Sequence, residues 1–439
     1  MKRSEYMSKL SEALEIFGED VKLEIMEDYE EHYEIGLQNG KSEEQISEEL
    51  GEIEELVKEL KKSEITEKRP DKTVTLEKMN GEIVGNQTSF VTLEKGQGEQ
   101  SFKNLNEFKG NQTNDDQPRK IEVRSKFAHV EVTRSMDDQI RLEWVNYQTS
   151  RAKDYYEFRS WMEGGIIYGE LCKKNSAVLF VPMFGGDVQI KVQVPNGFPE
   201  LEVQSLSGDT VMHDVSFQSV ELRSASGNIE VDHSNTNQMA LDTKSGKVIC
   251  KQSQAANLNV DTKSGNTTFF QIQSSTIHVH SLSGDVRGDH LTGDCNVSTA
   301  SGDITIASAT GRQNDFYSVS GEIEIEHLQG ESIKLQSKSG DIEAEICVKN
   351  CTASSISGDI EIKNAQEGCF TLSSVSGDVE LTCNNIAGYV ADVHTVSGKT
   401  ECRFRDIHNQ KLKNGVYTYG AGSSKIKAKT TSGDIEIRA

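Results

Sequence analysis

Residues 335–343 read LQSKSGDIE, and close variants of this stretch recur from residue 201 to the C-terminus. Each copy centres on a Ser-Gly dipeptide, and nine of the eleven intervals between successive glycines are 18 or 19 residues long. The twelve glycines are Gly208, Gly227, Gly246, Gly265, Gly284, Gly302, Gly321, Gly340, Gly358, Gly377, Gly398 and Gly433. A constant period near 20 residues is typical of proteins built from stacked repeats.

The residues that flank each glycine alternate in polarity with a period of two, which is the pattern of a β-strand. Five positions before the glycine the residue is apolar, and two positions after it the residue is β-branched, as Leu335 and Ile342 are around Gly340. The inward columns fall at odd offsets before the glycine and at even offsets after it. We therefore expect a corner at each glycine, with the glycine at positive φ. The sequence predicts a mainly β fold, a β-solenoid (β-helix) of ~19-residue coils with a small N-terminal helical domain.

Two further columns carry polar side chains. Serine precedes every glycine directly, and Ser or Thr stands three positions before it, as Ser337 does. A buried hydroxyl without a partner costs about 1–3 kcal/mol, so we expect hydrogen bonds between these columns from coil to coil. Directly after the glycine Asp or Asn predominates, as at Asp341. These side chains could accept hydrogen bonds from their own turn, bind Ca²⁺, or act as catalytic carboxylates, and we favour the first role.

Composition limits the classes of function. The net charge of −23 disfavours binding to nucleic acid or to an anionic membrane. Aromatic residues make up 6% of the chain, which fits thin coils, and the eight cysteines form no CxxC pair. We therefore expect packing roles for the cysteines, and no cofactor or metal. Because no apolar run is long enough to span a membrane and no signal peptide is visible, we expect a cytoplasmic protein, peripheral to the membrane at most.

Residues 1–63 have a different pattern, that of an acidic helical domain. Apolar residues recur at helical spacing, and residues 42–45 form a capping box at the start of a helix. The acidic cluster contains Tyr29, Glu30, Glu31 and His32, which we interpret as a solvated helix face and as a weak candidate for a partner-binding surface. Residues 64–120 are polar and aperiodic, as in a flexible linker. Residues 121–200 are predicted to form an irregular β entry that caps the solenoid, and residues 201–439 to form its twelve repeats.

Two family resemblances follow from particular motifs. The stretch VQVPNGFPELEVQSLSGD at 192–209, with NGVY at 414–417, is similar to the bacterial β-strand-repeat family labelled "putative adhesin", and the likeness covers 121–439. DYEEH at 28–32, GKSEE at 40–44 and the Leu-Gly at 50–51 resemble the HAAS-type domain, although this chain lacks the proline that usually follows the Leu-Gly. HAAS-type domains are joined to membrane segments and associated with PadR-like regulators, so the resemblance implies a role in signalling or protein contact.

These observations favour a non-enzymatic scaffold or interaction protein. We expect an adhesin-like solenoid with a repetitive polar surface and a helical head that docks a protein partner, with cell-envelope stress signalling as the process that the resemblance implies. The alternative is a β-helix that binds a glycan, or that cleaves polysaccharide with carboxylates on the solenoid. Enzymatic use would point to one group of polar residues, which we interpret as a coil irregularity. The group is His278, His280, Arg287, Asp289 and His290.

Overall fold

The computed structural model describes residues 2–15, 42–50, 118–137, 139–146, 156–173 and 188–439 except 385, 406, 410 and 411. It also describes positions 22, 26, 29, 30, 33, 53, 89 and 90. The buried apolar side chains of these residues fall into two separate cores, one helical and one in the β-sheets. Within these ranges, no helix has both the length and the apolarity needed to cross a membrane.

The helical core is formed around α1 (Arg3–Ala13) and α3 (Glu43–Leu50). The predicted stripe is buried, since Tyr6, Leu10 and Leu14 are at most 3% exposed. The predicted capping box is confirmed, because the Ser42 N–H donates to Gln45 Oε1 at 2.9 Å and the Gln45 N–H donates to Ser42 Oγ at 3.3 Å. These reciprocal bonds satisfy donors at the start of α3 that have no partner within the helix.

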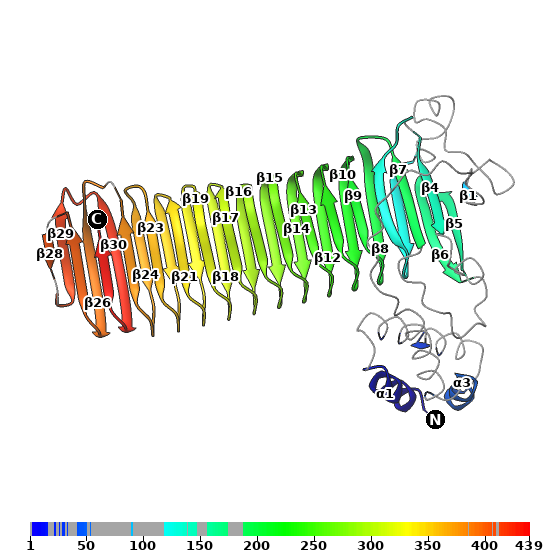
Figure 1. The fold of residues 1–439 in the computed structure, drawn as a ribbon, viewed down its shortest axis with the longest axis horizontal. Coiled ribbons are helices and arrows are strands. Elements are labelled where there is room, and N and C mark those ends of the chain that lie inside the picture. The colour runs from blue at the N-terminus through cyan, green and yellow to red at the C-terminus, as the bar shows by residue number, and fades with distance from the viewer. Residues whose placement is uncertain are drawn as a thin grey trace, which may run out of the picture.

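The rest of the described chain is a β-solenoid, which confirms the predicted fold class (Figure 1). Each coil gives one strand to each of two parallel sheets. Sheet 1 holds the strands that follow the repeat glycines: β9 (Thr210–His213), β11 (Ile229–Asp232), β13 (Val248–Lys251), β17 (Ile304–Thr310), β19 (Ile323–Gln329), β21 (Ile342–Cys347), β23 (Ile360–Asn364), β25 (Val379–Cys383), β27 (Thr400–Phe404) and β31 (Ile435–Arg438).

Sheet 2 holds the strands that precede the glycines: β8 (Phe198–Ser205), β10 (Ser216–Ser224), β12 (Asn235–Thr243), β14 (Gln254–Thr262), β18 (Gln313–Ser318), β20 (Ser332–Gln336), β22 (Asn350–Ser354), β24 (Cys369–Ser373), β26 (Gly388–Ser397) and β30 (Ser424–Ser432). The long strands β15 (Thr267–Ser281) and β16 (Val286–Thr299) continue from sheet 1 into sheet 2. Apolar side chains from both sheets fill the space between them in one continuous core.

The order of coils in space differs from their order in the chain at both ends of the stack. β2 (Lys120–Ser125) lies between β6 (Ile166–Lys173) and β8, and β3 (His129–Arg134) lies between β7 (Val188–Val194) and β9. At the other end, the C-terminal β30 and β31 lie between the coil of β24 and β25 and the coil of β26 and β27. Each end coil is therefore held by a segment distant in sequence.

Antiparallel strands cover both ends of the parallel stack. β5 (Tyr156–Glu163) pairs with β6, β4 (Arg141–Asn146) pairs with β7, and β1 (Ser89–Phe90) pairs with β4. At the other end β28 (Ile407–Asn409) pairs with β27, and β29 (Gly415–Gly420) pairs with β26. A change of strand direction removes the parallel template on which a further coil could stack.

The repeat glycines do lie at a corner, but the expectation of positive φ is wrong, because none of the twelve has a φ in the left-handed region. The glycines are instead stacked on one another. A Cβ at Gly340 would lie 2.1 Å from the carbonyl oxygen of Gly321, and across the twelve positions this distance to the neighbouring coil is 1.7–2.3 Å. Glycine is required here because the backbones of adjacent coils approach too closely for any side chain.

The left-handed residues lie at the other corner of the coil, where the chain passes from sheet 1 to sheet 2. Five non-glycine residues, each 19 positions from the next, have φ between 44° and 55°: Asp214, His233, Gln252, Gln271 and His290. Left-handed backbone costs an ordinary residue about 1–2 kcal/mol, so the stacking of the coils outweighs a local strain that recurs in every one of these coils.

One of the two hydroxyl columns is inside the solenoid. Ser337 Oγ accepts the Gly340 N–H at 2.8 Å and donates to the Gly321 carbonyl of the next coil at 3.3 Å, so the expected bond between coils exists, with a carbonyl as its acceptor. The serines directly before the glycines are exposed or half-buried, so the prediction that they face inward is wrong. The hydroxyls of Ser224 and Thr262, in the inner column, lack a hydrogen-bond partner.

Candidate functional site

The Asp and Asn column after the repeat glycines forms a ladder of hydrogen bonds. Asp359 Oδ1 accepts the backbone N–H of Asp378 at 2.7 Å, and the Asp359 N–H donates to Asp341 Oδ1 at 2.8 Å. Equivalent bonds link Asp209 to Asn228, Asn228 to Lys247, Asn266 to Asp285, Asp303 to Glu322, Asp378 to Asp434 and Asp434 to Lys399.

The donors in this ladder belong to the adjacent coil, which corrects the expectation that each side chain caps its own turn. One oxygen of each ladder side chain is occupied by a backbone amide. Among the residues that the structure describes, no three His, Cys, Asp or Glu side chains are grouped as metal ligands. The column therefore acts as a structural ladder between coils.

The polar residues singled out for enzymatic use do not form one site. His278 and His280 lie on sheet 2, whereas Arg287, Asp289 and His290 lie on sheet 1 or at its corner. Arg287 pairs with Asp285 at 3.0 Å, and His280 Nδ1 lies 3.0 Å from Ser298 Oγ.

Asp289, His290 and Ser308 are in contact, but not in the order of a catalytic triad. Ser308 Oγ donates to Asp289 Oδ1 at 2.8 Å, and His290 Nδ1 lies 2.8 Å from the same oxygen. The bond from Ser308 is the main cause that lowers the pKa of the Asp289 carboxyl. A nucleophilic serine needs a base that takes its proton, with the histidine between serine and carboxylate. Here the histidine ring reaches the carboxylate alone, so the serine is not activated.

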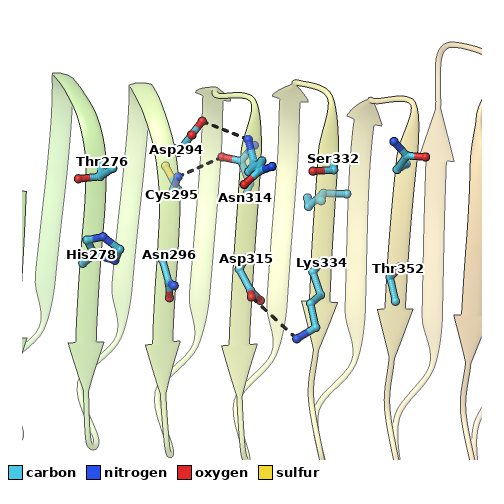
Figure 2. A pocket seen from close by; sticks show the side chains of 13 residues that line it. Thr276, His278, Asp294, Cys295, Asn296, Asn314, Asp315, Ser332, Lys334 and Thr352 are labelled. Carbon is cyan, nitrogen blue, oxygen red and sulfur yellow. Dashed lines mark hydrogen bonds and ion pairs between the residues drawn. The ribbon is translucent and has the colours of Figure 1, made fainter.

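The outer face of sheet 2 contains a groove of about 600 Å³ across β15, β16, β18, β20 and β22 (Figure 2). Two rows of outward side chains line it, one residue from each strand. The first row is Thr276, Asp294, Gln313, Ser332 and Asn350, and the second is His278, Asn296, Asp315, Lys334 and Thr352. The residues of the second row are paired in register from strand to strand. Neighbours along each row are therefore separated by the strand spacing of about 4.8 Å.

The charges in this groove are already engaged. Asp315 and Lys334 form an ion pair of 3.9 Å, and Asp294 Oδ1 accepts the backbone N–H groups of Arg312 at 2.7 Å and Gln313 at 3.1 Å. Six other lining side chains make no hydrogen bond within the described part of the chain: His278, Asn296, Gln313, Ser332, Asn350 and Thr352. Their amide, hydroxyl and imidazole groups leave donors and acceptors available to a ligand.

The groove lies where the coil geometry changes. The register between β15 and β16 shifts between Gln273 and Thr276, and the glycine spacing of this coil falls to 18 residues. Later coils turn from sheet 1 to sheet 2 at Gly293, Gly311 and Gly330. A second hollow of about 630 Å³ follows this corner and shares Asp294 with the groove. The sequence analysis missed both, and the shortened interval was the available signal.

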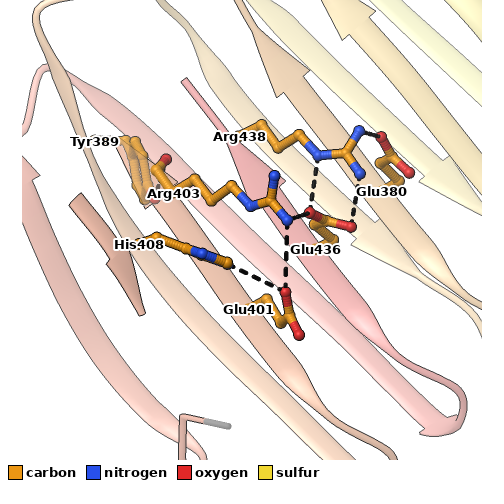
Figure 3. A network of polar contacts seen from close by, with 7 residues as sticks. All are labelled: Glu380, Tyr389, Glu401, Arg403, His408, Glu436 and Arg438. Carbon is orange, nitrogen blue, oxygen red and sulfur yellow. Dashed lines mark hydrogen bonds and ion pairs between the residues drawn. The ribbon is translucent and has the colours of Figure 1, made fainter. Parts of the chain in front are cut away.

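Sheet 1 has a different surface chemistry in the C-terminal coils. Six glutamates are in register there: Glu324, Glu343, Glu361, Glu380, Glu436 and Glu401. Figure 3 shows that Arg438 bridges Glu380 and Glu436, with its two bonds to Glu436 at 2.8 Å each. Arg403 lies 3.5 Å from Glu436 and 3.9 Å from Glu401. Burial is the main cause that raises the pKa of the Glu380 carboxyl.

The proposed contact cluster in the helical head is only partly described. Tyr29 is 5% exposed and its ring stacks on Tyr6 with centroids 6.1 Å apart, so its side chain belongs to the core. Glu30 is exposed, and Glu31 and His32 lie outside the described residues. A partner would therefore meet the acidic side chains around Tyr29 and not the ring itself.

Two family models match the chain. The model described as Toastrack DUF4097 matches residues 118–292 and 289–438, and the HAAS model matches residues 5–59. None of the curated proteins matches the sequence.

Several solved structures resemble the chain at low identity. A "putative adhesin" from Parabacteroides distasonis is 14% identical, with a TM-score of 0.30, and the match covers 60% of this chain and 92% of that one. A "putative lipid binding protein" from the same organism is 15% identical, with a TM-score of 0.28 and coverage of 74% and 95%. A "putative cell adhesion protein" from Clostridium sporogenes is 6% identical, with a TM-score of 0.20 and coverage of 75% and 96%.

Proposed function

This chain belongs to the Toastrack DUF4097 family, and from that premise we propose that it is a non-enzymatic binding scaffold. Its sheet 2 offers polar side chains at the constant spacing of the coils to a ligand that is itself repetitive. The observation that carries the proposal is the groove of Figure 2, where six polar side chains have unused hydrogen-bonding capacity. Rows of amides and hydroxyls about 4.8 Å apart are complementary to the hydroxyl groups of a glycan.

Binding without cleavage fits this groove better than hydrolysis does. Glycoside hydrolysis needs a carboxylic acid to protonate the leaving oxygen and a second carboxylate on the other side of the bond. Asp294 accepts two backbone amides and Asp315 is paired with Lys334, so both carboxylates of the groove are held in their ionised form by their partners.

We further propose that the helical head docks a protein partner, with regulators of cell-envelope stress signalling as the candidate class. Three observations support this. The head has a hydrophobic core of its own, residues 5–59 match the HAAS model, and exposed acidic side chains such as Glu12, Glu15 and Glu30 cover it. The proposed location is the cytoplasm, including the membrane surface. The division into 1–63, 64–120, 121–200 and 201–439 remains a prediction.

The groove proposal is tested by blocking the groove in the full chain. Asn296 is exposed within the groove on sheet 2, and Thr268 is equally exposed on sheet 1. We expect Asn296→Trp to reduce binding to immobilised polysaccharides at least tenfold, and Thr268→Trp to leave it unchanged. Equal binding by both variants would show that the ligand does not use the groove.

The docking proposal is tested by cross-linking the full chain in cells. Glu30→Lys reverses one exposed charge of the head, and Glu326→Lys makes the same change on the solenoid. We expect Glu30→Lys alone to weaken the cross-linked partner band. Loss with both variants, or with neither, would refute docking through this acidic face.

A further inference from the structure

Strand β30 presents three lysines in one line on the outer face of sheet 2. Lys425, Lys427 and Lys429 alternate with the buried Ile426 and Ala428, and all three lysine side chains are exposed. Within the described part of the chain, none of the three forms an ion pair. Successive outward residues of a strand are about 7 Å apart, so the three ammonium groups repel one another without a counter-charge.

The same coil treats its cations differently on the opposite face. On β31, which belongs to the same coil as β30, Arg438 is bonded to Glu436 and to Glu380 of the neighbouring strand (Figure 3). Arg403 and Lys363 on sheet 1 are likewise paired with glutamates. A chain with 70 acidic and 47 basic residues has enough carboxylates to neutralise every lysine. The unpaired lysines of β30 are therefore a local feature of sheet 2.

The strands beside β30 add hydroxyl groups and little negative charge. Thr371 and Ser373 of β24 are in register with Lys427 and Lys429. On the other side, β26 places Asp392 beside Lys427 and His394 beside Lys429. Asp392 is the single carboxylate in these flanking columns, and it forms no ion pair in the described part of the chain. The excess positive charge on this surface remains available to a ligand.

This lysine strand is continuous with the groove. Thr352, which lines the groove, is in register with Thr371, and Thr371 is in register with Lys427. A ligand that lies across the strands of sheet 2 would meet amides and hydroxyls over β16 to β22, hydroxyls over β24, and ammonium groups over β30. That order of side chains suits a polymer that carries hydroxyl groups along its length and negative charges at intervals.

We propose that the ligand of sheet 2 is an anionic polysaccharide, and that Lys425, Lys427 and Lys429 bind its carboxylates or other acidic groups. This inference rests on the proposed glycan-binding function and specifies the charge of the ligand. Ammonium groups on a rigid strand bind anions by charge-assisted hydrogen bonds, and binding through them weakens steeply with salt.

The test compares polygalacturonate with its methyl ester, which has the same sugar backbone without the charges. The full chain is assayed as wild type, as Lys425→Gln/Lys427→Gln/Lys429→Gln, and as a control with Lys244→Gln/Lys263→Gln/Lys338→Gln. The control lysines are also exposed and lack ion pairs, but lie at the glycine corner. We expect the β30 variant to bind polygalacturonate at least tenfold more weakly, with a log–log salt slope smaller by roughly 2, and the control to behave like wild type.

The other outcomes separate the two proposals. If the ester binds as well as the acid, and the β30 variant binds like wild type, the glycan proposal stands and the anionic inference is wrong. If neither polymer binds, inorganic polyphosphate serves as a second probe. Lysine-dependent binding of polyphosphate alone would retain the anion site and refute the glycan proposal. No binding of any probe, or equal loss in both lysine variants, overturns the inference.

Discussion

Replacing Gly340 by alanine should destabilise the solenoid severely, because the position has no room for a methyl group. The new Cβ would lie 2.1 Å from the Gly321 carbonyl oxygen and 2.5 Å from its carbon. Heavy atoms in proteins do not approach within 3.0 Å of a Cβ, so the two coils must separate by about 1 Å at this corner.

That separation lengthens the hydrogen bonds that join the coils there. The bond from Ser337 Oγ to the Gly321 carbonyl is 3.3 Å, and the bond from the Ser339 N–H to the Val319 carbonyl is 3.0 Å. The loss of two bonds costs about 1 kcal/mol each, and forcing a methyl group into packed structure costs about 1–3 kcal/mol more. We expect Gly340→Ala to lower the free energy of unfolding by about 3–5 kcal/mol.

A second substitution distinguishes close approach from backbone conformation. If Gly340 were needed for positive φ, asparagine would be tolerated better than alanine, because asparagine adopts that region more readily. Close approach predicts that Gly340→Asn is at least as damaging. Gly164 is the control, since it has a φ of +56° and a Cβ added there would have no neighbouring atom within 4 Å. There Asn should be tolerated better than Ala.

The assay is urea unfolding followed by far-UV circular dichroism, with the midpoint and slope compared between variants. Long repeat arrays can unfold in parts, so a broadened transition also counts as destabilisation. The reasoning is refuted if Gly340→Ala stays within about 0.5 kcal/mol of wild type, or if Gly340→Asn is clearly the milder change.

Three more predictions concern other corners and the core. Gln252 has a φ of 44°, so Gln252→Gly should raise the free energy of unfolding by up to about 1 kcal/mol, whereas Lys251→Gly in the adjacent strand should lower it. Asp359→Asn keeps the acceptor for the Asp378 N–H and should be at least as stable as wild type in urea titration, whereas Asp359→Ala should lose about 1 kcal/mol. Burial raises the pKa of the Cys250 and Cys351 thiols to about 12, so the unfolded chain releases these protons near pH 9 while the folded chain keeps them. Stability is therefore complete below about pH 8 and falls between about pH 9 and 12, by up to ~1.4 kcal/mol per pH unit for each thiol; unfolding at pH 8 and 10 should show a smaller fall in Cys250→Ala.

The repeat fold could be predicted because its determinants are local and recur twelve times. Alternation around residues such as Leu335 and Ile342 specifies strands and their inward faces, and the constant spacing specifies the coil. The role of Gly340 could not be inferred in this way, because a requirement for close approach and one for positive φ select the same residue. The left-handed corner escaped notice because Gln252 and its equivalents are not glycines.

The ladders and the end coils depend on contacts between segments distant in sequence. Whether Asp359 bonds its own turn or the next coil depends on the stacking geometry, which one repeat does not reveal. Insertion of β30 between β24 and β26 reverses the chain order of the last two coils, and only their paired registers show it. The groove was missed for the same reason, since its lining comes from five strands and its single local signal is one shortened interval.

The most direct test of the binding account is a lysine acetylation footprint of the full chain, read by mass spectrometry with and without polygalacturonate. Lys334 lines the groove and Lys425, Lys427 and Lys429 lie on β30, whereas Lys244 and Lys263 lie at the glycine corner. The account predicts that the ligand protects the first four lysines and leaves the other two as reactive as before. Protection confined to Lys244 and Lys263, or equal at all six positions, would contradict the claim that sheet 2 is the binding surface.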